Sequence, residues 1–172
     1  QGDVGSGKTM VAWLSSLDVI ERGGQVLWMA PTEMLAEQHF LNLRGYAQAL
    51  EISPALLTAS TPARERKILL EGIAQGVIPF IVGTHALIQE AVRAPRMSLG
   101  VIDEQHRFGV LQRLSLQQLA GRGATDSEPH MLLMSATPIP RSLAMVLYGD
   151  MEVSYLDEMP PGRTPIDTRV LY

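Results

Sequence analysis

The feature that most constrains the fold is a regular alternation of short, continuously apolar runs with longer amphipathic stretches. Runs that are apolar at every position, rather than at every second one, are typical of strands covered on both faces of a sheet. The predicted strands are residues 25–30, 54–58, 80–83, 99–103 and 130–135.

Helical spacing of apolar residues marks the stretches between these runs. The predicted helices are residues 9–23, 33–50, 61–76 and 106–121. Gly23, Gly24 and Gly76 stand where helices are expected to end. Strands that alternate with helices pair in parallel through right-handed crossovers. The sequence therefore predicts an α/β fold, a parallel β-sheet with helices on both faces.

Composition narrows the class of protein. A chain of 172 residues fits one domain. No apolar run reaches the roughly 18 residues of a membrane span, and no signal peptide is visible, so we expect a cytoplasmic protein without a membrane partner. The absence of cysteine excludes disulfides and thiolate metal sites. A net charge of −4 argues against a broadly basic surface that binds nucleic acid. It is still compatible with local contacts to nucleic acid through backbone amides and hydroxyls.

The segment GDVGSGKT, residues 2–9, matches the pattern of a phosphate-binding loop. Glycines let backbone N–H groups approach a polyphosphate, and the following helix offers its positive N-terminal end. Lys8 is expected on the β- and γ-phosphates and Thr9 on Mg²⁺. The alternative, a chance glycine-rich turn before a helix, is disfavoured. The predicted nucleotide-binding residues are Gly2, Asp3, Val4, Gly5, Ser6, Gly7, Lys8 and Thr9.

Two carboxylates follow the apolar run that ends at residue 102. Asp103 is predicted to bind Mg²⁺, directly or through water, because ligands bind at the carboxyl ends of strands in open α/β sheets. Glu104 is then placed to polarise the attacking water. A solvated acidic turn is the alternative, and the phosphate loop makes it less favoured. The predicted catalytic residues are Glu104, Asp103 and Lys8, and the predicted cofactors are ATP and Mg²⁺.

Five segments in order resemble the motifs of superfamily-two DExH helicases. They are GDVGSGKT (2–9), APTEMLAEQH (30–39), VGTHALIQ (82–89), DEQHRFGV (103–110) and SATPIPR (135–141). Four segments closely resemble the RecG family of bacterial ATP-dependent helicases of branched DNA: GDVGSGKT, DEQHRFGV, SATPIPRSLAMVLYGD (135–150) and the late DEMPPGRTPIDTR. One departure is Ala59, where that family more often has glycine.

This resemblance implies that residues 1–158 form the first of two RecA-like motor domains, a P-loop NTPase fold, and that residues 159–172 lead towards the second. It also implies a strand before residue 1, cut away here, which would leave a gap or an exposed edge. The implied partners are branched DNA, the second RecA-like lobe and an N-terminal wedge domain of the parent chain. The implied function is helicase or translocase activity on replication forks and Holliday junctions, in DNA recombination and repair. The alternatives are the transcription-repair coupling translocase, a non-helicase P-loop ATPase, and a purely structural module.

Further roles come from the resemblance alone. Pro31, Thr32, Thr84 and His85 would line the path of a DNA strand. Helix capping is the alternative for the two threonines. His106, Ser135 and Thr137 would couple the nucleotide state to the DNA side, the alternatives being a helix start and a turn before proline. The remaining expectations are a surface position for Gln38 and His39, core positions for Trp13, Trp28 and Phe40, and a structural role for His130.

The isolated 172-residue chain is predicted to hydrolyse ATP very weakly, because arginines from a second lobe are worth about 10³–10⁵ in rate. Steady-state ATPase assays of the isolated chain and of a complete motor check this. Comparable turnover in the two would contradict it.

Overall fold

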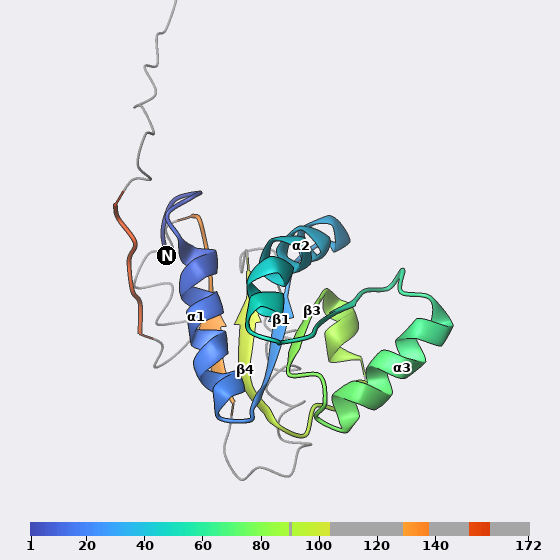
Figure 1. Ribbon diagram of the computed structural model, residues 1–172. Helices are drawn as coiled ribbons and strands as arrows, with labels where there is room; N and C mark the ends of the chain where they lie inside the picture. The colour runs from blue at the N-terminus through green and yellow to red at the C-terminus, as the bar shows by residue number, and fades with distance from the viewer. Residues whose placement is uncertain (90, 104–128, 138–151, 159–172) are drawn as a thin grey trace, which may run out of the picture.

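The computed structural model describes residues 1–89, 91–103, 129–137 and 152–158. Five parallel strands form one sheet in the order β2-β3-β1-β4-β5 (Figure 1). The strands are β1 (Gln25–Met29), β2 (Pro54–Leu57), β3 (Phe80–Gly83), β4 (Met97–Ile102) and β5 (His130–Leu133). All five predicted strands are confirmed, and His130 begins β5 as expected.

Helices cover both faces of this sheet, as predicted. Helices α1 (Lys8–Glu21) and α2 (Glu33–Ala49) pack on one face, and α3 (Ala63–Ala74) and the short 3₁₀ helix η1 (His85–Ile88) pack on the other. In Figure 1 the sheet runs between α1 and α3. The helix expected over residues 106–121 lies outside the described residues.

The two packing layers follow from the alternation of side chains along β1, which is buried at every position. Val26 and Trp28 enter the cluster under α1 and α2, and Leu27 and Met29 enter the cluster under α3. The ring of Phe80 makes edge contacts with two indoles, at centroid distances of 5.2 Å to Trp13 and 6.0 Å to Trp28.

The core positions expected for Trp13 and Trp28 are confirmed, and Phe40 lies at the border of the core. Trp13 and Trp28 are buried, and Phe40 packs against the same cluster with part of its ring exposed.

Parallel pairing brings the carboxyl ends of the strands to a single edge. Backbone hydrogen bonds continue past the strands there: Ala30 N–H donates to Gly83 O at 2.9 Å, Asp103 N–H to Met29 O at 3.0 Å, and Met134 N–H to Ile102 O at 2.8 Å. This edge is where ligands bind in open α/β sheets.

Within the described part of the chain, no helix is long and apolar enough to cross a lipid bilayer.

The close approach of β2 to β3 predicts different outcomes for two glycine substitutions. A Cβ on Gly83 would lie 2.1 Å from the backbone oxygen of Leu57, whereas one on Gly45 of α2 would meet nothing within 4 Å. Gly83→Ala should lower the free energy of unfolding by about 1–3 kcal/mol or more, because the strands must separate. Gly45→Ala should raise it by about 0.5–1 kcal/mol. Urea unfolding measures both, and equal effects would contradict the strand register.

Candidate functional site

The phosphate loop has the backbone that its glycines predict. Gly5 and Gly7 have φ angles of 83° and 96°, in the left-handed region that side chains disfavour. Gly7 is the N-cap of α1, and its carbonyl oxygen accepts from Met10 N–H at 2.9 Å and Val11 N–H at 3.1 Å. Lys8 and Thr9 therefore lie in the first turn of a helix whose N-terminus points its free N–H groups into the loop.

Lys8 is held by the loop itself. Its ammonium donates to the carbonyl oxygens of Gly2 at 2.6 Å and Asp3 at 2.7 Å. The Asp3 oxygen also accepts from Ser6 N–H at 3.1 Å, which closes the turn. These contacts keep the ammonium of Lys8 beside the loop backbone. On phosphate binding, the ammonium would give up these carbonyl oxygens and bind phosphate oxygens instead.

Gly2 is closely surrounded by the Ser6 side chain and the Leu156 backbone. A Cβ on Gly2 would lie 2.5 Å from Ser6 Oγ and 2.8 Å from the Leu156 carbonyl oxygen. Ser6 Oγ is buried and, within the part of the chain that the structure describes, has no hydrogen-bond partner. A buried hydroxyl without a partner inside a glycine loop fits a site that takes a polar ligand.

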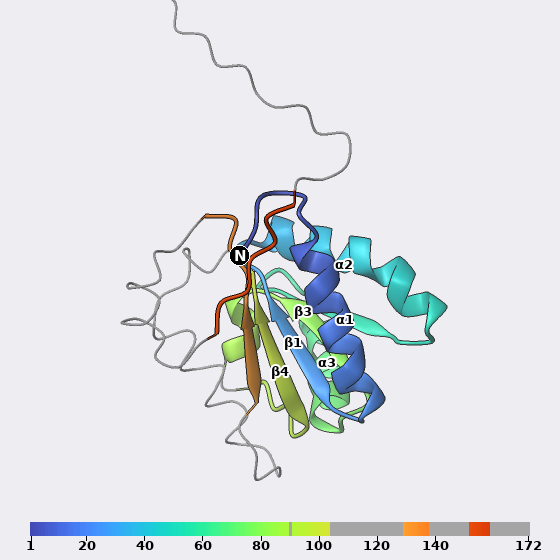
Figure 2. The same ribbon diagram turned by 90° about the vertical axis from the view of Figure 1, so that its left-hand side faces the viewer.

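The loop lies beside the end of β5. Gly2 N–H donates to Ser135 O at 3.3 Å, Leu156 N–H donates to Gln1 O at 2.7 Å, and Gly2 and Leu156 form a parallel bridge. Figure 2 shows residues 152–158, in red, passing next to the N-terminus. In the described part of the sheet β5 pairs with β4 alone.

Asp103 lies at the end of β4, the strand next to β5. Its Oδ2 is 2.7 Å from Nε2 of His39, and the two side chains are only 13% and 11% exposed. The position expected of Asp103, at the carboxyl end of its strand, is confirmed. Glu104 and His106 lie outside the described residues.

The expected surface position of His39 is wrong, although Gln38 is exposed as expected. His39 belongs to the buried stripe of α2, with Ala36, Leu43 and Ala47. The three- and four-residue spacing of this stripe was visible in the sequence. The hydrogen bond to Asp103 was not, because 64 residues separate the partners.

The donor set fits a metal that is shared with a nucleotide. Among residues 1–89, 91–103, 129–137 and 152–158, no group of three or more His, Asp or Glu could hold a metal ion. Mg²⁺ commonly takes one or two protein ligands together with substrate phosphates and water. Thr9 and Asp103 would supply the protein's share, and residues 2–9 would hold the phosphates.

The segment after β5 forms a compact turn. Ser135 Oγ lies 3.0 Å from Thr137 O and accepts from Thr137 N–H at 3.2 Å, and Ser135 is 2% exposed. The carbonyl oxygen of the same Ser135 accepts the bond from Gly2. One hydrogen bond therefore joins the phosphate loop to this turn.

Capping is confirmed for both threonines of the expected DNA path. Thr32 is the N-cap of α2 and accepts from Leu35 N–H at 3.3 Å. Thr84 caps η1, accepts from Ala86 N–H at 3.5 Å, and is 1% exposed, so its hydroxyl serves the cap. His85, next to it, is exposed, and Pro31 is half-buried.

The turn at residues 58–61 is tied to the start of α2. Ser60 N–H donates to Glu33 Oε1 at 3.1 Å. Hydrogen bonds from Ser60, first of all from its side chain, hold the pKa of Glu33 below its usual value. Arg66 of α3 donates to Thr58 O at 3.2 Å and to the side chain of Gln89. These hydrogen bonds link the segments that follow β1, β2 and β3.

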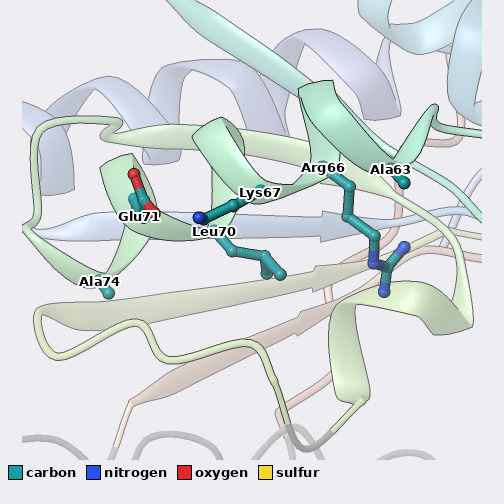
Figure 3. Close-up of a pocket in the computed structure, with 6 residues that line it drawn as sticks. All are labelled: Ala63, Arg66, Lys67, Leu70, Glu71 and Ala74. Carbon is teal, nitrogen blue, oxygen red and sulfur yellow. The ribbon is translucent and has the colours of Figure 1, made fainter.

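Two hollows lie away from the phosphate loop. One, of about 360 Å³, is lined by α3 alone, as the six labelled side chains of Figure 3 show. Another, of about 320 Å³, lies between α2, β2 and α3 and includes Phe40, Thr58 and Ser60. Neither contains a residue of the expected nucleotide site.

The chain belongs to the DEAD/DEAH box helicase family, whose model matches residues 1–146. A phosphate loop and an aspartate at neighbouring strand ends are features of P-loop NTPases in general, and the family match identifies the helicase branch among them.

Similarity to particular members of that family extends over nearly the whole chain. The chain is 52% identical over 168 residues to the ATP-dependent DNA helicase RecG of Pasteurella multocida, and the match covers 98% of this chain and 24% of that protein. It is 51% identical over 169 residues to RecG of Escherichia coli K12, again covering 98% and 24%. The chain therefore spans about a quarter of the length of these relatives.

A solved structure of RecG bound to a three-way DNA junction superposes with a TM-score of 0.77 at 43% identity, covering 96% of this chain and 21% of that one. The helicase domain of Hef from Pyrococcus furiosus, with a TM-score of 0.67 at 23% identity, shares the fold.

Substitution of Thr32 tests the cap at the start of α2. Thr32→Ala should lower the free energy of unfolding by about 0.5–2 kcal/mol, because the Leu35 N–H loses its acceptor. Thr32→Ser keeps a hydroxyl oxygen and should stay close to the unsubstituted chain. Urea unfolding of the three proteins gives the comparison. A Thr32→Ala protein as stable as Thr32→Ser would show that the cap contributes nothing.

Proposed function

We propose that this chain is the first RecA-like motor domain of a RecG-type DNA helicase, which uses ATP to move along branched DNA such as replication forks and Holliday junctions. The observation that carries the proposal is the placement of the phosphate loop and Asp103 at neighbouring strand ends of one sheet edge. An ATP–Mg²⁺ site needs these two groups together.

In this proposal the nucleotide lies against residues 2–9. Lys8 leaves the carbonyl oxygens of Gly2 and Asp3 to bind the β- and γ-phosphates. Thr9 and Asp103 would hold Mg²⁺, and Glu104 would orient the attacking water. Bound Mg²⁺ would supply neutralisation of the charge that develops on the phosphates.

The DNA strand lies across the ends of β1 and β3, against Pro31, Thr32, Thr84 and His85. Support comes from the polar character of this edge and from the similarity to a protein solved with a three-way DNA junction. With Thr84 buried, its share of the contact is the backbone at the start of η1. A net charge of −4 is compatible with this, since the contacts are few and local.

Coupling between the two sites runs through Ser135, Thr137 and His106. The hydrogen bond from Gly2 N–H to Ser135 O supports this role for Ser135. Residues 1–158 form the motor domain and residues 159–172 lead onward. We place the protein in the bacterial cytoplasm.

In this proposal, further domains of the parent protein complete the helicase. The relatives are about four times as long, which supports a parent protein with a second RecA-like lobe and an N-terminal wedge domain. The wedge would select branched DNA and the second lobe would bring arginines to the phosphates. The similarity to RecG over almost the whole chain favours this assignment over the transcription-repair coupling translocase.

Lys8→Ala in the full-length protein tests the proposal. DNA-stimulated ATP hydrolysis should fall by about 10²–10³-fold, because the variant lacks the cation that stabilises the transferred phosphoryl group. Lys67→Ala, on the surface of α3, is the matched control and should change the rate little. ATPase assays with a synthetic fork and with linear duplex give both the rate and the preference for branched DNA.

Undiminished hydrolysis in Lys8→Ala would overturn the proposed site. Equal stimulation by fork and linear duplex would overturn the assignment to branched DNA and leave the site in place.

A further inference from the structure

The imidazole of His39 occupies a core-facing position of α2. It lies on the stripe formed with Ala36, Leu43 and Ala47, and it packs against the indole of Trp28 at a centroid distance of 5.4 Å. An apolar side chain is the usual occupant of such a position, because a ring N–H removed from water needs a partner. Its partner here is Asp103, at the end of β4.

The distance within this pair is that of a hydrogen bond, and carboxylate chemistry indicates which atom donates. His39 Nε2 lies 2.7 Å from Asp103 Oδ2, and both side chains are largely shielded from solvent. An ionised carboxylate only accepts hydrogen bonds, so Nε2 carries the proton and donates it. A charge-assisted bond of this length is strong and directional.

Asp103 is thereby held from two sides. Its backbone N–H donates to Met29 O at 3.0 Å, which sets the Cα at the end of the sheet. The bond from His39 fixes Oδ2, and so sets the rotation of the carboxylate about its side-chain bonds. A metal site depends on such outer contacts, because they orient the ligand before the metal arrives.

We propose that His39 is a positioning residue for the Mg²⁺ site, which it serves by orienting the carboxylate of Asp103. The inference rests on the proposed function, since it takes Asp103 as the residue that holds the metal. His39 itself touches neither nucleotide nor metal in this role. It acts from α2, whose N-cap is Thr32, through its hydrogen bond to Asp103 at the end of β4.

Three substitutions separate positioning from packing. His39→Leu fills the space beside Trp28 but donates no hydrogen bond. His39→Gln places an amide N–H near the position of Nε2 and keeps a donor. Gln38→Ala, at the exposed neighbouring position of α2, is the matched control. All are made in the full-length protein, and thermal melting by circular dichroism shows whether each folds.

The measurement is the binding of an ADP whose ribose carries a fluorescent N-methylanthraniloyl group. Binding is followed while Mg²⁺ is titrated, and the experiment is repeated in EDTA. His39→Leu should raise the Mg²⁺ concentration for half-maximal effect by about 10–100-fold, and its nucleotide affinity in EDTA should equal that of the unsubstituted protein. His39→Gln should recover most of the loss. Gln38→Ala should titrate like the unsubstituted protein.

An unchanged Mg²⁺ titration in His39→Leu would overturn the inference. So would equal impairment in His39→Leu and His39→Gln, which would assign His39 to packing alone. If His39→Leu fails to fold, His39→Asn replaces it, because its shorter side chain holds the amide out of reach of Asp103.

The unsubstituted protein tests the underlying assumption separately. Mg²⁺-independent nucleotide binding there would overturn the proposed function, whereas a defect confined to the His39 variants supports the inference.

Discussion

The parallel pairing of the five strands is the constraint on which the rest of the structure depends. Because all strands run the same way, their carboxyl ends meet at one edge, and the chain must return across a face of the sheet each time. The returns are the helices that bury β1 on both sides. The same directionality collects the phosphate loop, Asp103, the two capped helix starts and the Ser135 turn at a single edge. Fold and site therefore have one cause.

Electrostatics at this edge is local rather than global. The chain is acidic overall, with a net charge of −4. The groups that would attract phosphate are instead local: the first turn of α1, the ammonium of Lys8 and the loop N–H groups made accessible by glycine. Glu33, an acidic residue at the start of α2, is engaged by Ser60. Contacts of this kind are local and can be exchanged one by one.

The predictable part of the site is the part that is contiguous in sequence. The phosphate loop is eight consecutive residues whose chemistry is local, and its left-handed glycines have the backbone that the motif requires. The capping roles of Thr32 and Thr84 are also local, since each hydroxyl bonds an amide within three residues. By contrast His39 was misplaced. The helical spacing of the buried stripe could be recognised in the sequence, but histidine is a polar residue and is usually expected at the surface. Its burial is favourable only because it has a hydrogen-bond partner elsewhere in the fold.

Sequence by itself determined the alternation of strands and helices, the two-faced burial of the strands, and the phosphate-binding loop, because each depends on residues near one another along the chain. Tertiary structure decided the order β2-β3-β1-β4-β5, the position of the loop beside Ser135 and Leu156, and the bond between His39 and Asp103. These depend on which segments meet in space. That meeting is set by the packing of the whole sheet, and no local pattern of residues encodes it.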